Sequence, residues 1–226
     1  HVEGRLVKNQ LAVGLPMAFQ YSITAIGTTM VQMALNTLGS TYVAAFTAAS
    51  KCEQMAGQAY IALGSAIATF AAQNVGAGRY DRVRKGFART TEFGFIFSIV
   101  MGFIMYFFGY VVTGLFVSGD ASALEGMVDV YMKFTALFLF PLTIVNVYRN
   151  GIQGMGYGLL PMMAGVAELV GRGSVALIAI HYHSYNGVCL ASPMAWILAT
   201  ALLLTMYFAI MRKHPVRKNG ENTLDK

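Results

Sequence analysis

Charged residues are scarce in this sequence. Of its 226 residues, only 12% are Asp, Glu, Lys or Arg, whereas 56% are hydrophobic. A water-soluble domain carries about 25% charged residues, so much of the charge that a water-facing surface needs is missing. A disordered chain is also excluded, because disorder combines low hydrophobicity with high charge. The composition, with a mean hydropathy of +0.56, predicts an integral membrane protein.

Cysteines and catalytic motifs are equally sparse. The two cysteines, Cys52 and Cys189, lie far apart in apolar stretches and form neither a CxxC pair nor a disulfide framework. The sequence has no Ser-His-Asp set, no HExxH motif and no GxxxxGK[ST] loop. Hydrolase chemistry and ATP-driven transport therefore have no support. We expect no enzyme activity, no catalytic residue, no cofactor and no metal site.

What the sequence does contain is a series of long apolar stretches. A helix needs about 20 apolar residues to cross the hydrocarbon core of a bilayer. Six stretches meet this length, over about residues 11–35, 43–72, 93–117, 128–148, 159–180 and 188–210. The sequence thus predicts an all-α, polytopic membrane protein with six transmembrane helices, the second of them tilted or extended beyond the membrane.

The basic residues gather on one side of this predicted topology. Thirteen of the 16 lysines and arginines lie in the N-terminal lead, the loop after the second stretch, position 149 and the C-terminal tail. The connections at 36–40, 118–126 and 181–187 contain none. Because cytoplasmic loops are enriched in Lys and Arg, both ends are expected in the cytoplasm, in a plasma (inner) membrane. The net charge of +6 therefore reflects topology and does not predict nucleic-acid binding.

Several short motifs lie at or near the ends of the predicted helices. The first stretch opens with Gly-Leu-Pro at 14–16, and the second ends in the glycine-rich segment 72–78, before a basic turn at 79–85. A second glycine-rich segment, 149–156, precedes Pro161 at the start of the fifth stretch, which also carries Gly165, Glu168 and Arg172. In this order and placement the motifs resemble the six-helix lobe of multidrug and toxic compound extrusion (MATE) transporters.

The resemblance implies an architecture larger than this chain. Members of that family have twelve helices in two related lobes that face each other across a central cavity. Residues 1–212 would form one lobe, the C-terminal one, and residues 213–226 a cytoplasmic polar tail. The N-terminal lobe of the same polypeptide would be its partner, and a chain that opens on His1 is expected to be a piece of a longer protein.

The resemblance also implies a function. It predicts a secondary active exporter that exchanges Na⁺ or H⁺ for organic cations or other drug-like molecules, with the lobes rocking to give alternating access. Two alternatives stay open. One is a related flippase for a lipid-linked saccharide, which is disfavoured because few cationic residues lie near the helices. The other is a non-transporting membrane scaffold or the membrane half of an enzyme.

Two carboxylates lie at membrane depth, where charge is costly and marks functional or paired residues. Glu53 is predicted either to lie on a proton or cation pathway or to be hydrated, or paired with Lys51, near the interface. Glu168 and Arg172 lie four residues apart, so one helix face carries both, and we expect a structural ion pair between them. A coupling role for Glu168 is the alternative.

Uncharged polar residues complete the predicted pathway. We expect Gln20, Gln32, Glu53 and Asn146 to line a substrate cavity that faces the other lobe. In some family members the C-terminal lobe binds its coupling ion through carboxylates in the first and fourth helices. Here neither helix has a central one, and Asp129 lies at the edge of the fourth. Either the ion site lies in the other lobe, or Glu53 and Glu168 perform its role.

Overall fold

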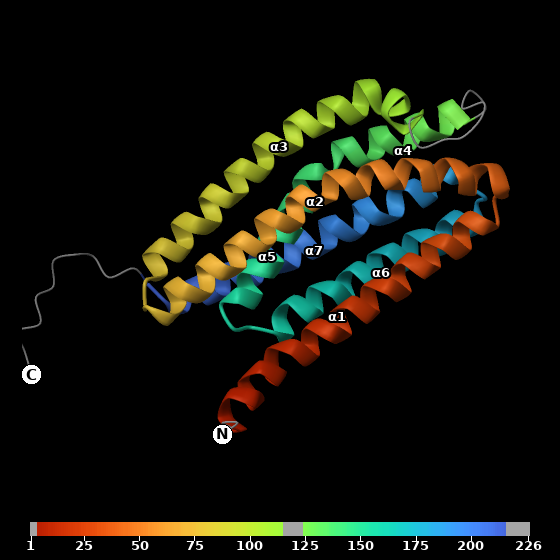
Figure 1. Cartoon of the computed structure of the whole chain (residues 1–226). Helices are drawn as coiled ribbons and strands as arrows, with labels where there is room; N and C mark the ends of the chain where they lie inside the picture. The colour runs from red at the N-terminus through yellow and green to blue at the C-terminus, as the bar shows by residue number, and fades with distance from the viewer. Residues whose placement is uncertain (1–3, 115–123, 216–226) are drawn as a thin grey trace, which may run out of the picture.

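The structure is a computed structural model that describes residues 4–114 and 124–215, and the regular elements in these ranges are helices. They run side by side along one long direction (Figure 1). Their bounds are α1 Gly4–Asn36, α2 Ser40–Gly76, α3 Tyr80–Gly114, α4 Glu125–Leu137, α5 Leu139–Gly154, α6 Leu159–His181 and α7 Tyr185–Lys213. The predicted all-α fold is confirmed, and most of the predicted tail lies outside the described residues.

The six predicted membrane spans correspond to these seven helices of the described ranges, with two differences. One predicted span is divided into two helices, and one helix is less apolar than the others. Helices α2, α3, α6 and α7 are each long and apolar enough to cross a membrane, and α4 with α5 passes the same test as one bent segment. Helix α1 contains the predicted stretch 11–35 and begins earlier, at Gly4, but it is not among the helices that pass this test. Its second half carries Thr24, Thr28 and Gln32, which lower its hydropathy.

The fourth predicted span, 128–148, is not one continuous helix. Helices α4 and α5 meet at Phe138 with a bend of 53°. Pro141 explains the break, because its ring nitrogen cannot donate to the carbonyl of Leu137 and its ring crowds that carbonyl. Buried hydroxyls join α5 to its neighbours beside the bend: Ser98 lies 2.8 Å from Thr143 and 2.9 Å from Tyr60.

Glycines let α6 approach its neighbours closely. A Cβ on Gly158 would lie 2.9 Å from the carbonyl oxygen of Ala12 in α1, and one on Gly171 would lie 2.7 Å from Leu198 in α7. Small residues at such contacts allow close helix packing in lipid. Helix α1 accordingly packs along α6 and has few contacts with α2, its neighbour in sequence (Figure 1).

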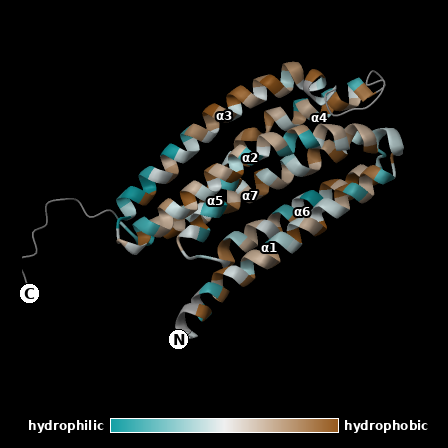
Figure 2. Ribbon diagram, in the orientation of Figure 1, coloured by the Kyte–Doolittle hydropathy of each residue, from teal (hydrophilic) through white to brown (hydrophobic). Residues whose placement is uncertain are grey.

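The outer surface of the bundle is apolar. Large side chains such as Phe93, Phe107 and Val111 on α3 and Leu177 on α6 are more than half exposed. Hydrophobic residues cover much of α3, while its hydrophilic residues gather at its N-terminal end, just after the turn from α2 (Figure 2). This distribution is the one expected of helices whose outer faces contact lipid.

Candidate substrate cavity

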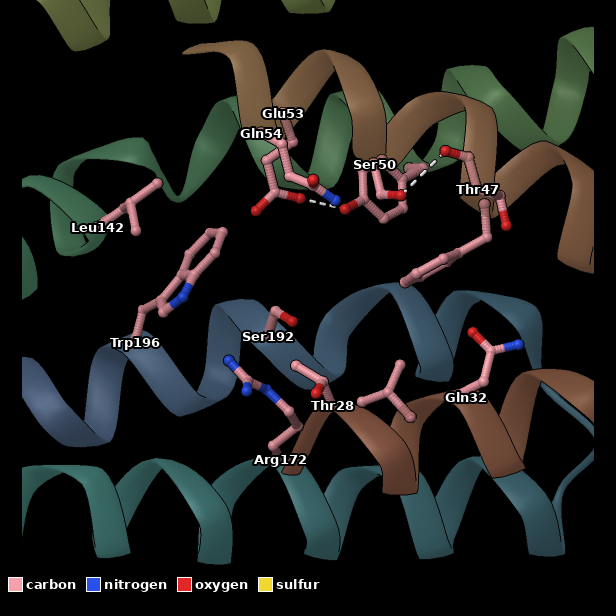
Figure 3. A pocket seen from close by; sticks show the side chains of 13 residues that line it. Thr28, Gln32, Thr47, Ser50, Glu53, Gln54, Leu142, Arg172, Ser192 and Trp196 are labelled. Carbon is pink, nitrogen blue, oxygen red and sulfur yellow. Dashed lines mark hydrogen bonds between the residues drawn. The ribbon is translucent and has the colours of Figure 1, made fainter. Parts of the chain in front are cut away.

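A cavity of about 460 Å³ lies between the α1–α6 pair and helices α2 and α7. Five helices, α1, α2, α4, α6 and α7, supply its polar side chains, and Figure 3 shows Glu53 and Arg172 on opposite sides of the space. The lining consists of Thr28, Val31 and Gln32 from α1; Phe46, Thr47, Ser50, Glu53 and Gln54 from α2; Tyr131 and Leu142; Arg172 from α6; and Ser192 and Trp196 from α7. The cavity therefore combines one carboxylate and one guanidinium with aromatic walls.

Glu53 brings the carboxylate to this cavity. It is half-buried on α2, and the buried phenol of Tyr131 in α4 donates a hydrogen bond to it. Lys51 is exposed and forms no ion pair with Glu53, since residues two apart on a helix point in different directions. A phenol, and not an ammonium group, thus holds this carboxylate beside the cavity.

Arg172 brings the guanidinium from the opposite side. Its side chain is 6% exposed, and its Nε and Nη1 atoms are buried without a hydrogen-bond partner in the described chain. The side chain crosses Gly27 of α1, where a Cβ would lie 3.4 Å from both its Cδ and its Nη1 atoms. Arg172 thus packs against α1 at Gly27 and extends from α6 toward the cavity (Figure 3).

The ion pair predicted between Glu168 and Arg172 is wrong. Glu168 instead accepts a hydrogen bond at 2.5 Å from Arg149 near the end of α5, and both side chains are largely buried. The i,i+4 spacing does place Glu168 and Arg172 on one helix, but Arg149 reaches the carboxylate from a neighbouring helix. This pair lies away from the cavity lining and joins α5 to α6.

The other predicted pathway residues divide between the cavity and the bundle interior. Gln32 lines the cavity and donates to Asn36 at 3.0 Å. Gln20 is buried and accepts from Gln153 at 2.9 Å, while Asn146 donates to the carbonyl of Leu142 at 3.0 Å. Gln20 and Asn146 are absent from the lining of this cavity. The hydrogen bond of Gln20 joins α1 to α5, and that of Asn146 lies within α5.

Asp129, the carboxylate at the edge of the fourth predicted span, is also paired. It accepts from Lys133 at 2.7 Å, one turn along α4. In the described ranges, no three His, Cys, Asp or Glu side chains gather into a possible metal site. Of the carboxylates discussed at sequence level, Glu53 is thus the one that lines the cavity.

Sequence reasoning missed several lining residues. Ser50 and Gln54 flank Glu53 in the sequence, and both line the cavity. They lie four residues apart and therefore on one face of the helix, which is a signal that could have identified them. Trp196 is the single tryptophan of the sequence, but that rarity does not indicate which helix it faces, and Ser192 carries no comparable signal within the apolar stretch 188–210.

Fold and cavity together define the class of protein: a polytopic α-helical membrane protein with a cavity among its helices that is lined by one carboxylate and one guanidinium. The family model MatE matches residues 16–176, and the chain therefore belongs to the MatE family. This confirms the family predicted from the sequence.

Curated relatives and solved structures agree with this assignment. The "FAD transporter" of Shewanella oneidensis is 24% identical over 213 residues, covering 94% of this chain and 46% of that protein. The Bacillus subtilis protein named "Probable multidrug resistance protein YoeA" is 20% identical over 211 residues, covering 92% and 45%. An outward-facing multidrug resistance MATE family transporter of the MOP superfamily superposes with a TM-score of 0.88 at 17% identity, covering 96% of this chain and 49% of that chain. The chain thus spans about half the length of the proteins it matches.

Proposed function

We propose that this chain is the C-terminal six-helix lobe of a two-lobe secondary active transporter that exports organic cations or other drug-like molecules in exchange for Na⁺ or H⁺. The observation that carries the proposal is the carboxylate of Glu53 at the wall of a cavity of about 460 Å³ with aromatic sides. Family membership, and relatives named as multidrug resistance and FAD transporters, support small organic solutes as cargo.

Exchange follows from competition for one carboxylate. An organic cation and a coupling ion both gain most by approaching a negative charge in a cavity of low dielectric constant, and Glu53 can neutralise one of them at a time. The hydrogen bond from Tyr131 fixes the position of that carboxylate. Trp196 and Phe46 supply faces that attract a flat cation. Binding of one ligand therefore favours release of the other.

The coupling ion has two possible locations in this scheme. Glu53 is our first choice within this lobe, since Glu168 is already paired with Arg149. The other location is the N-terminal lobe, which we propose as the partner of this chain on the same polypeptide. The uneven distribution of Lys and Arg supports cytoplasmic ends for this segment in the plasma (inner) membrane.

A flippase for a lipid-linked saccharide is less well supported. Such a substrate carries a pyrophosphate, and a cavity for it needs several cationic side chains. Among the described residues that line this cavity, Arg172 is the single cationic one. The Bacillus subtilis relative described above is named as a probable multidrug resistance protein.

The test is efflux by the complete protein in cells stripped of their own drug pumps. Ethidium efflux is measured with and without imposed Na⁺ and pH gradients, for the wild type, for Glu53→Gln and for Glu92→Gln. Glu92 is an exposed carboxylate on α3 paired with Arg89, so its replacement is the matched control. We expect gradient-driven efflux in the wild type and the control, and a loss of the gradient dependence in Glu53→Gln.

Two results would contradict parts of this proposal. Efflux that follows neither gradient would exclude ion-coupled antiport. Coupled efflux that survives both Glu53→Gln and Glu168→Gln would place the ion site in the other lobe.

A further inference from the structure

The guanidinium of Arg172 lacks the acceptors that a buried cation needs. Arg172 is 6% exposed, and two of its nitrogen atoms are buried without a partner in the described chain. A guanidinium remains protonated and offers five N–H donors, so burying it is costly unless acceptors or an anion compensate. Because Arg172 lines the cavity, a molecule bound in the cavity is in a position to supply the missing acceptor.

The nearby carboxylates are already engaged by other side chains. Glu168, one turn before Arg172 on α6, accepts from Arg149 at 2.5 Å. Glu53, across the cavity, accepts from the phenol of Tyr131. Neither carboxylate hydrogen-bonds to Arg172.

Two hydroxyl groups of the cavity wall also make bonds elsewhere. Thr28 donates to the carbonyl of Ala25 at 2.8 Å, and Ser50 donates to that of Thr47 at 3.0 Å. These hydroxyls thus bond to their own helices. Figure 3 shows Arg172 extending from α6 toward the cavity. Its Nε and Nη1 atoms are themselves buried, so Nη2, which is not among the buried partnerless atoms, is the donor placed to meet a molecule in the cavity first.

We propose that Arg172 anchors an anionic oxygen group, a carboxylate or a phosphate, of the exported solute. The planar fork of a guanidinium matches both groups and can hold either by two parallel hydrogen bonds. This inference rests on the proposed export function and narrows its substrate class. With Glu53 on α2 receiving the positive group and Arg172 on α6 the negative one, the cavity is matched to a zwitterion with an aromatic body.

A matched pair of dyes tests this assignment. Rhodamine 110 carries a free carboxylate, and rhodamine 123 is its methyl ester with the same cationic ring system. Dissociation constants for both are measured by fluorescence anisotropy on the purified complete protein. We expect the wild type to bind rhodamine 110 about tenfold or more tightly than rhodamine 123, as one charge-assisted hydrogen-bonded pair predicts.

Variants at position 172 assign the preference to this side chain. Arg172→Gln is expected to abolish the preference for rhodamine 110, and Arg172→Lys, which keeps the charge but not the fork, to retain part of it. Arg89→Gln, which removes an exposed arginine of α3, is the matched control and should keep the full preference. Sodium benzoate and sodium phosphate are then titrated against bound rhodamine 110, and the stronger competitor identifies the preferred anion.

Several outcomes would overturn the inference. They are equal affinity of the wild type for both dyes, a preference that survives Arg172→Gln, an equal loss of both affinities in Arg172→Gln, and competition by neither anion. None of these measurements uses an ion gradient. Failure of ion-coupled antiport would therefore appear in the ethidium assay alone and would leave the dye preference intact.

Discussion

Arg149 of α5 donates a hydrogen bond at 2.5 Å to Glu168 of α6, and within residues 4–114 and 124–215 this contact leaves Arg172, one turn further along α6, without a hydrogen-bonded carboxylate partner. The two arginines therefore have different environments. Arg149 joins two helices of the bundle, whereas Arg172 faces the cavity.

The first prediction concerns this ion pair. Glu168→Gln leaves Arg149 largely buried without its counter-charge, so we expect a loss of about 3–5 kcal/mol in the free energy of unfolding. The double variant Arg149→Gln, Glu168→Gln should recover much of that loss, because neither charge then remains unpaired. Unfolding of the purified complete protein by denaturant in detergent measures both quantities.

The exposed pair of Arg89 and Glu92 is the control for this cycle. Its side chains are 75% and 57% exposed, so breaking it should change stability by about 0–1 kcal/mol. A double variant of the buried pair whose loss equals the sum of the two single losses would show that Arg149 and Glu168 do not stabilise the protein as a pair.

The second prediction concerns the contact between α2 and α5. A Cβ added at Gly154, the last residue of α5, would overlap the backbone of Ala68 in α2, with the Ala68 Cα at 2.7 Å. Because backbone cannot move aside as a side chain does, Gly154→Ala should cost about 1–3 kcal/mol, measured as a lower apparent melting temperature.

Gly57→Ala provides the matched glycine. Gly57 lies within α2, and a Cβ there would meet no atom of another described segment within 4 Å. Alanine favours a helix over glycine by about 0.5–1 kcal/mol, so this variant should keep or raise the melting temperature. Equal melting temperatures for the two variants would argue against close contact at Gly154.

The third prediction concerns the end of α7. Arg84 near the start of α3 donates to the carbonyl oxygens of Met211 at 2.6 Å and His214 at 3.1 Å. The last carbonyls of a helix have no partner within it, and a cation there is stabilising. Arg84→Gln should therefore speed amide hydrogen exchange at the C-terminal end of α7, as mass spectrometry can measure. Unchanged exchange there, or the same effect from Arg89→Gln, would contradict this role of Arg84.

Helix positions were predictable because they depend on runs of apolar residues. The break between α4 and α5 was not predicted, although Pro141 is visible in the sequence, because the stretch 128–148 remains apolar across it. Hydropathy averaged over a window responds to composition and not to the loss of one backbone donor.

The residues that line the cavity were predictable only where a polar side chain interrupts an apolar stretch. Glu53 and Gln32 are conspicuous in apolar stretches, and both line the cavity. The partner of Glu168 was predicted incorrectly because spacing along one helix indicates neighbours in that helix alone. Arg149 lies 19 residues away in sequence, and contact with it depends on how α5 packs on α6.

The turn between α1 and α2 limits how the cavity can change shape. It contains only residues 37–39, with Gly39 at a φ of 110°, and its amides bond back to the end of α1. So short a tether prevents α1 from sliding lengthwise past α2. Helix α1 has few contacts with α2, but the buried hydrogen bond between Gln20 and Gln153 joins it to α5. A change in the shape of the cavity should therefore come from tilting of α1 about the turn, which breaks that hydrogen bond, and not from piston-like displacement.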